Sequence, residues 1–392
     1  MSNNYSGLPK KLEDALKRCD LLVGDEILDY YYNLYDPETG GFYYSISSRD
    51  LEGMTPFAEG TRFVLESLAA GGIGVPDWEK ERVGKWIYEH QDKDDGYFYE
   101  DMWGKSTHGP RKDRDLTYSV DILRKYCSMD TKYPIPEERI KNDVKNAAVP
   151  EYLKSRENII AYMDSLDWST KSIWLTGQKL CSALSLIRAA GLFDTVSEYV
   201  AGRQNPETGL WGESCQWMNT NGGMKLSVFF RDTDHPYPRI ETMIDSVLSI
   251  FAGDTPALHA TYIWNPFVLL GAALSSMEGE RKVLMREKLL DKGADIVNFA
   301  VDSALKLKRP DGGFSSNIDK AQATQQGFLY GLGLPDESDM DGTVIAGHRL
   351  RSTIHNVFGV KCSSDYYAKY ADEFWEKCRN KPKVVKTKKL EG

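Results

Sequence analysis

Residues 204–212 read Gln-Asn-Pro-Glu-Thr-Gly-Leu-Trp-Gly and lie between two segments of helical pattern. Three other stretches share this order of an acidic turn residue, a glycine and an aromatic residue: 35–43 (Tyr-Asp-Pro-Glu-Thr-Gly-Gly-Phe-Tyr), 91–98 (Gln-Asp-Lys-Asp-Asp-Gly-Tyr-Phe) and 309–314 (Arg-Pro-Asp-Gly-Gly-Phe). Proline and aspartate favour a turn, glycine supplies a positive φ, and the aromatic side chain can fill the space between helices. Four copies in one chain indicate an internal repeat.

The segments between these turns have helical periodicity and alternate in polarity. Long, charged segments cover residues 12–34, 77–90, 135–166, 193–203, 238–251 and 281–308. Segments rich in Ala, Gly and Leu cover residues 55–70, 115–126, 169–190, 221–231, 265–277 and 339–358. A helix with one polar face lies outside, whereas a helix that is apolar nearly all round is buried. Period-2 alternation is almost absent, so strands are at most incidental.

We therefore expect an all-α fold, namely a single (α/α)6 toroid of six inner and six outer helices over residues 1–380. Residues 381–392 form a short basic tail, which we expect to be disordered.

The four turns resemble the QW-type repeats of the terpenoid cyclase and protein prenyltransferase toroids. Related Gly-aromatic turns occur in the (α/α)6 barrels of many carbohydrate-active enzymes. The resemblance implies the toroid fold and leaves the reaction open.

The composition argues against several classes of binding partner. The formal net charge of −9 argues against a nucleic-acid or anionic-membrane partner, and no apolar run reaches membrane-spanning length. The N-terminal residues lack the basic-then-apolar layout of a signal peptide. The six cysteines are scattered without a CxxC pair, which is typical of reduced thiols in a cytoplasmic protein. We expect no metal and no cofactor, and the oligomeric state stays open.

The inner helices of such a toroid run parallel, so their N-termini meet at one mouth and favour anionic or polar ligands there. We expect Asp115, Asn221, Asn265 and Asp339 to cap four of these helices. The candidate catalytic residues around this mouth are Asp341, Asp115, Glu59, Tyr118 and His259. The candidate substrate-binding residues are Trp211, Trp217, Trp264, Tyr262, Asn221, Lys225, Asn265, Arg239 and His348.

Carboxylates and aromatic rings together favour a carbohydrate-active enzyme, because paired acids cleave glycosidic bonds and aromatic rings stack on sugars. The basic residues Lys171, Lys225 and Arg239 suit an acidic sugar, which would be an imported oligosaccharide in the central cavity. Hydrolysis, β-elimination and epimerisation all remain open.

Residues 339–343, Asp-Met-Asp-Gly-Thr, support a different hypothesis. They resemble the Asp-x-Asp-Asp motif of class II terpene cyclases, which implies Asp341 as proton donor and Asp339 as its partner. The sequence departs from that motif at Gly342, and it lacks the second helical domain that those cyclases usually carry. A cavity that stabilises carbocations should be lined by aromatic and aliphatic groups, and the inner helix starts here are more polar.

Two further classes of protein share the toroid fold. Zinc prenyltransferases fit poorly, because Cys181 and Cys215 lack Asp and His partners at the spacing of that family. A non-enzymatic toroid that binds a peptide or protein is the remaining alternative.

Overall fold

The computed structural model describes residues 3–143, 148–231 and 233–389, and this part of the chain is mainly helical. The longer helices are α1 (Lys10–Asp20), α2 (Glu26–Leu34), α4 (Ala58–Ala70), α5 (Asp77–His90), α6 (Gly109–Asp121), α7 (Pro136–Asp143), α8 (Arg156–Asp164), α9 (Ile173–Ser182), α11 (Phe193–Gly202), α12 (Trp217–Leu226), α13 (Ile240–Ala252), α14 (Ala260–Ser275), α15 (Gly279–Leu305), α17 (Leu350–Val357) and α18 (Ala371–Arg379). The shorter helices are α3 (Ile46–Asp50), α10 (Leu184–Ala189) and α16 (Met340–Thr343). A two-stranded antiparallel hairpin, β1 (Thr324–Gln325) and β2 (Phe328–Leu329), interrupts the helical pattern. The expected all-α class is confirmed at the level of secondary structure.

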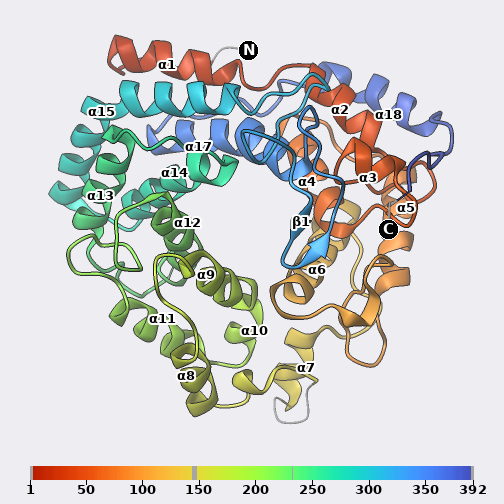
Figure 1. Cartoon of the computed structure of the whole chain (residues 1–392), viewed down its shortest axis with the longest axis horizontal. Coiled ribbons are helices and arrows are strands. Elements are labelled where there is room, and N and C mark those ends of the chain that lie inside the picture. The colour runs from red at the N-terminus through yellow and green to blue at the C-terminus, as the bar shows by residue number, and fades with distance from the viewer. Residues whose placement is uncertain (1–2, 144–147, 232, 390–392) are drawn as a thin grey trace.

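Several helical segments contact one another in a closed order. Helix α4 contacts α6, α6 contacts α9, α9 contacts α12, α12 contacts α14, and α14 contacts α17. Helix α16 and the π-helical turn Val344–Arg349, which leads from α16 into α17, return to α4 and close the order. Figure 1 shows these helices around a common centre, and we call them the central ring.

Other helices lie outside the central ring. Helix α13 contacts α14 and α15, and α1 contacts α15 and α17. Some expected segments are broken in two: Gly24 separates α1 from α2, and Pro150 lies between α7 and α8. Helices α9 and α12 approach closely at Gly177 and Gly222. A Cβ on Gly177 would lie 2.9 Å from the Gly222 carbonyl oxygen, so only glycine fits there.

The four repeat turns have the same local structure. Each forms one antiparallel bridge: Tyr35 with Phe42, Gln91 with Phe98, Gln204 with Trp211, and Lys308 with Phe314. The turn glycines all have positive φ, from 63° at Gly209 to 98° at Gly312. The four aromatic residues are at most 1% exposed. The expected turns, with an aromatic residue that fills the space between helix ends, are therefore confirmed.

Three of the four expected helix caps are wrong. Helix α6 begins at Gly109, so Asp115 lies inside it, and Asn221 and Asn265 likewise lie inside α12 and α14. The side chains that cap α12 and α14 are those of Gln216 and His259. The start of α6 is placed too late because its first turn, Gly-Pro-Arg-Lys, has the composition of a loop. The start of α14 is placed too late because Asn265 and Pro266 have the order of a cap and a first-turn proline, whereas Pro266 lies inside the helix. Asp339 does cap α16, since its carboxylate accepts a hydrogen bond from the Gly342 N–H at 2.7 Å.

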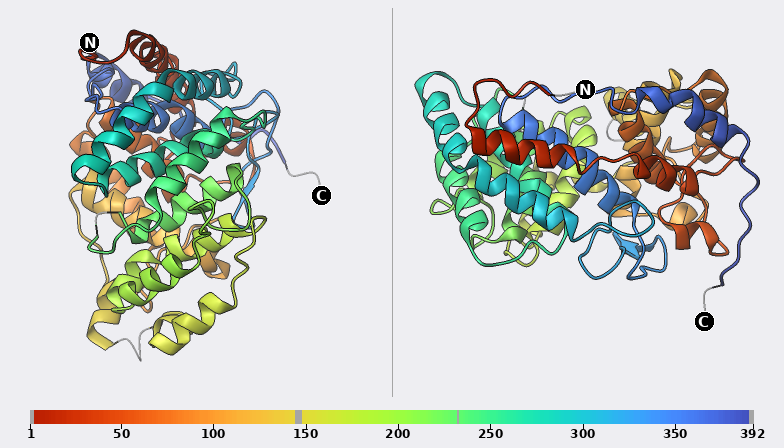
Figure 2. Two further views of the ribbon diagram at one scale, coloured as in Figure 1. Left: turned by 90° about the vertical axis from the view of Figure 1, so that its left-hand side faces the viewer. Right: turned by 90° about the horizontal axis from the view of Figure 1, so that it is seen from above.

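The basic tail contacts the N-terminal helices as far as the structure describes it. The Lys381 ammonium donates to three main-chain carbonyls, including that of Tyr35 at 2.7 Å, and the Thr387 N–H donates to the Asp50 carbonyl at 2.8 Å. Figure 2 shows this segment running along the outside of the molecule after α18. Within the described residues, no helix combines the length and apolar character needed to cross a membrane.

Candidate functional site

Charged side chains from several helices of the central ring lie near one another. They come from α4, α6, α12, α16 and the π-helical turn after α16. We call this set the central cluster, and its members are Arg62, Glu66, Arg114, Lys225, Asp341 and Arg349.

The three arginines of the central cluster are paired with carboxylates. Arg349 Nη2 lies 2.6 Å from Glu66 Oε2, and Arg62 contacts the same carboxylate one helical turn away. Arg114 contacts Glu59, the second residue of α4. The side chains of Arg62, Arg114 and Arg349 are 17%, 13% and 16% exposed, so solvent still reaches these ion pairs.

Asp341 and Lys225 differ from the arginines, because neither forms an ion pair within the described chain. The Asp341 carboxylate accepts a hydrogen bond from the amide of Gln325 on β1. Burial raises the pKa of Asp341 to about 6, against the opposing effect of the nearby Arg114. Burial, with Arg114 as the next cause, lowers the pKa of Lys225 to about 8. Both groups therefore titrate close to neutral pH.

A second group of charges lies deeper, between α4 and α6. Arg111 Nη2 lies 2.6 Å from Asp115 Oδ1, and Arg111 also contacts Glu59 and the Tyr330 hydroxyl. All four residues are at most 1% exposed. Burial raises the pKa of Asp115, and Arg111 opposes that rise. We call Glu59, Arg111 and Asp115 the buried ion-pair group.

Two of the expected aromatic residues lie beside the central cluster. The Trp264 indole N–H donates to Thr353 Oγ1 at 2.8 Å, and the Arg349 guanidinium lies 5.5 Å from the indole ring centre. The Tyr118 ring lies 5.9 Å from the Arg62 guanidinium and 5.3 Å from that of Arg114. Both rings are partly exposed, so they can contact a ligand as well as the arginines.

The hairpin β1–β2 contacts the starts of two ring helices. Gln325 reaches Asp341 in α16, and Gln326 Oε1 lies 3.3 Å from Arg111 Nη1 in α6. Phe328 packs against the Trp103 and His108 rings just before α6. Within the described residues, the hairpin therefore supplies the one side-chain donor that forms a hydrogen bond with the Asp341 carboxylate.

Four expected residues are brought together around the start of α14 and the neighbouring turn of α12. His259 Nδ1 accepts a hydrogen bond from the Thr261 N–H at 3.1 Å, and burial lowers the pKa of His259 to about 4. The Tyr262 ring lies against His259, and Asn265 donates a hydrogen bond to Asn221. His259 thus acts as a neutral cap in this arrangement.

The other expected ligand-binding residues have local roles in the structure. Trp211 is fully buried, and its indole N–H donates to the Val200 carbonyl at 2.8 Å. The Trp217 indole N–H donates to the Thr255 carbonyl at 2.9 Å. His348 Nδ1 lies 3.0 Å from the Tyr366 hydroxyl.

Arg239 precedes α13, which lies outside the central ring. Its φ of 49° is left-handed, and its guanidinium lies 3.4 Å from Gln204 Oε1. These contacts place Arg239 with the outer helices.

Sequence reasoning missed Arg114, Arg349, Gln325 and Tyr330. Two spacings in the sequence are compatible with ion pairs along a helix face, because Arg62 and Glu66 are four residues apart, as are Arg111 and Asp115. No local pattern connects Gln325 to Asp341, because that contact depends on where the hairpin folds. Across the described ranges, no group of three or more His, Cys, Asp or Glu side chains is placed to hold a metal ion.

Comparisons with known proteins identified no family for this chain. No protein-family model matches the chain, and a search of curated proteins found no match.

Proposed function

We propose that the central ring and its outer helices form an (α/α)6 toroid whose centre catalyses a reaction on an acidic oligosaccharide. The closed order of contacts from α4 to α17 and the four equivalent turns support the toroid. A cytoplasmic location and an imported substrate belong to the same proposal.

The pair Asp341 and Lys225 carries the proposal. Their pKa values, about 6 and about 8, leave Asp341 mainly ionised and Lys225 mainly protonated at pH 7. A carboxylate and an ammonium in these states can act as general base and general acid. Neither group is neutralised by an ion pair in the described chain, so both are available to a substrate.

The surroundings of the pair favour a polar, anionic substrate. Arg114 and Arg349 supply guanidinium groups that bind carboxylates through two parallel hydrogen bonds. Trp264 and Tyr118 supply rings that can pack against a sugar. A uronic acid combines the carboxylate and the sugar ring that these side chains fit.

The same arrangement favours β-elimination over hydrolysis. Glycoside hydrolysis mostly uses two carboxylates, whereas the other acids that contact this group of side chains are engaged: Glu59 and Glu66 in ion pairs, and Asp339 as a helix cap. In elimination, Asp341 removes the proton beside the uronate carboxyl, and an arginine stabilises the charge that develops there. Lys225 then protonates the departing oxygen as the carbon–carbon double bond forms.

The test is incubation of the full-length protein with oligosaccharides of galacturonate, mannuronate and glucuronate. An unsaturated uronate product absorbs ultraviolet light, and Asp341→Asn and Lys225→Met should each lower its rate of formation by about 10²–10⁴-fold. Asp336→Asn is the matched control, because Asp336 is exposed on the loop that precedes α16. Equal rates in all three variants would contradict the assignment, and a saturated product would indicate hydrolysis.

A class II cyclase-like reaction is the second candidate, and the raised pKa of Asp341 is the observation that favours it. Gly342 weighs against it, because a Cβ there would lie 2.2 Å from the Ser315 carbonyl carbon and leaves no room for the second acid of that motif. The pH profile separates the two reactions. A cyclase needs protonated Asp341, so its rate should rise below pH 6, whereas the elimination rate should fall there and also above pH 8.

A further inference from the structure

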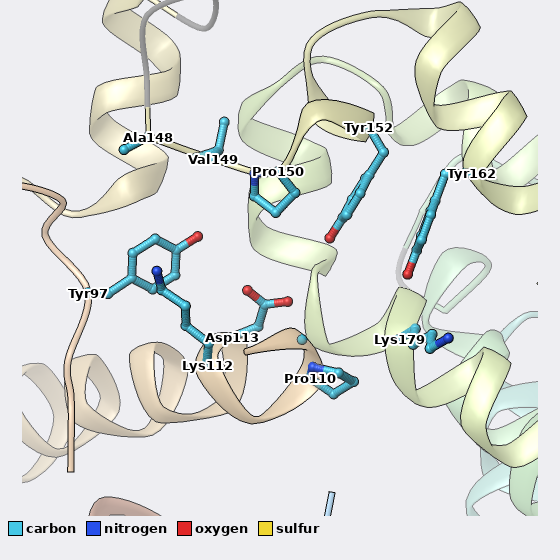
Figure 3. A pocket seen from close by; sticks show the side chains of 11 residues that line it. Tyr97, Pro110, Lys112, Asp113, Ala148, Val149, Pro150, Tyr152, Tyr162 and Lys179 are labelled. Atoms are coloured by element: carbon cyan, nitrogen blue, oxygen red, sulfur yellow. The ribbon is translucent and has the colours of Figure 1, made fainter. Parts of the chain in front are cut away.

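A pocket of about 450 Å³ lies away from the central cluster, where the start of α6 faces α9 and residues 148–162. Its volume is within the usual range for small-molecule sites. Figure 3 shows Asp113, Tyr97, Tyr152 and Tyr162 around this space, and none of them belongs to the site proposed above.

The oxygens of these four side chains face the pocket without partners. The carboxylate of Asp113 and the hydroxyls of Tyr97, Tyr152 and Tyr162 form no hydrogen bond or ion pair in the part of the chain that is described. Asp113 is only 7% exposed, so its carboxylate is a buried acid with no counter-charge. Burying such a group is costly unless something pairs with it.

The tyrosines present their hydroxyl ends to the pocket. Tyr152 and Tyr162 stack on each other, with ring centres 4.1 Å apart and planes at 10°, so those faces are not free for a sugar. The free face of Tyr97 is covered by the Lys112 ammonium at 3.8 Å. The pocket therefore offers oxygens, one of them anionic, rather than an aromatic platform.

Two lysines near the pocket are directed elsewhere. The Lys112 ammonium lies 3.4 Å from Asp95 and over the Tyr97 ring. Lys179 points away from Asp113 in Figure 3. Burial still raises the pKa of Asp113 to about 7, with Lys112 as a weaker opposing cause, so these lysines do not supply its missing counter-charge.

We propose that this pocket binds a small molecule through a protonated primary amine. Asp113 pairs with the ammonium group, and the tyrosine hydroxyls accept hydrogen bonds from it. An ammonium group has three N–H donors and no acceptor, which matches one carboxylate surrounded by phenol oxygens. The charge-assisted hydrogen bonds and the neutralised carboxylate provide the affinity. A single carboxylate gives too few anionic ligands for a divalent metal ion.

The experiment is calorimetric titration of the full-length protein at pH 8 with 1,5-diaminopentane and with ethanolamine. Alkyl ammonium groups remain charged at this pH, and Asp113 is ionised. The uncharged controls are 1,5-pentanediol and ethylene glycol, which replace the amines with hydroxyls. We expect at least one amine to bind with a Kd below about 10 mM and its diol to bind at least tenfold more weakly.

Variants of the pocket residues test whether the amine binds in this pocket. Asp113→Asn keeps the size of the side chain and should weaken amine binding at least tenfold, while Tyr152→Phe and Tyr162→Phe should each weaken it less. Asp341→Asn should leave amine binding unchanged, because Asp341 belongs to the central cluster. Thermal melting of each variant confirms that it is folded, and if Asp113→Asn does not fold, the two phenylalanine variants decide the question.

Three results would overturn the proposal. The first is that neither amine binds below about 10 mM, and the second is that a diol binds as tightly as its amine. The third is that binding survives in Asp113→Asn, or in both phenylalanine variants if Asp113→Asn is unfolded. Loss of binding in Asp341→Asn would place the amine at the central cluster and would count equally against this pocket.

Discussion

Arg111 contacts two carboxylates and a phenol hydroxyl, whereas Asp341 and Lys225 contact no opposite charge in the described chain, although all of them lie inside the same ring of helices. Desolvation alone does not separate the two regions, because Asp115 and Asp341 are both buried. The difference lies in pairing. Asp115 pairs with Arg111, and Asp341 forms no ion pair with any described residue.

This difference separates structural charges from candidate functional ones. A buried ion pair is stable once formed, and removing one partner leaves an uncompensated charge. An unpaired buried acid or amine lowers the stability of the fold, and its pKa moves toward neutrality. Such groups are concentrated at functional sites, which is why we assign chemistry to Asp341 and Lys225 and structure to the buried ion-pair group.

The largest effect should come from breaking the buried ion-pair group. Arg111→Met leaves Glu59 and Asp115 without their shared cation, so we expect the free energy of unfolding to fall by about 3–5 kcal/mol. Urea denaturation of the full chain measures it. The control is Lys171→Met, which removes an exposed cation at the edge of the ring. A loss for Arg111→Met as small as that of the control would show that this group is not structural.

A smaller effect should distinguish the two aspartates directly. Asp115→Asn removes one charged partner of Arg111 and should lower the free energy of unfolding by about 1–3 kcal/mol. Asp341→Asn removes a carboxylate without an ion pair and should leave stability unchanged or higher at pH 7.5, while abolishing turnover. If Asp341→Asn is the less stable variant, Asp341 is a structural residue and the functional assignment belongs elsewhere.

The elements that sequence reasoning located correctly are those that local chemistry determines. The order of glycine and aromatic residues at 204–212 specifies a turn with positive φ, and the same turn forms at all four copies. The periodicity of the segments likewise predicts a mainly helical chain, although polarity alone does not sort the helices: α6 of the central ring is highly charged, and α13 outside it is apolar. These patterns depend on neighbours along the chain, so they can be read from one sequence.

The candidate site was less predictable, because its side chains are defined by contacts between distant residues. Helix α6 starts with Gly-Pro-Arg-Lys-Asp-Arg-Asp, a composition typical of a loop. Its Arg111 and Arg114 pair with Glu59 from another helix, which the sequence of this segment does not reveal. The pocket at Asp113 depends on Tyr152 and Tyr162, which lie about 40 to 50 residues further along the chain. No spacing rule within one segment predicts such contacts.

The pH dependence of stability gives the smallest effect and the sharpest comparison. The folded pKa of Asp341, about 6, lies above its unfolded value, so its contribution to stability is fully present below about pH 4 and is lost as pH rises through 6.

The folded pKa of Lys225, about 8, lies below its unfolded value, so stability from this group returns only as pH rises from 8 toward about 10.5. Between pH 6 and 8 both groups are charged, and each therefore lowers the free energy of unfolding relative to its neutral form. Asp341→Asn should therefore match the parent protein at pH 4 and exceed it at pH 7.5, and Lys225→Met should exceed it at pH 7.5 and converge with it near pH 10. Chemical denaturation across this range measures both differences. Curves that stay parallel to that of the parent would mean that the two groups are already neutralised in the fold, and the acid–base assignment would then fail.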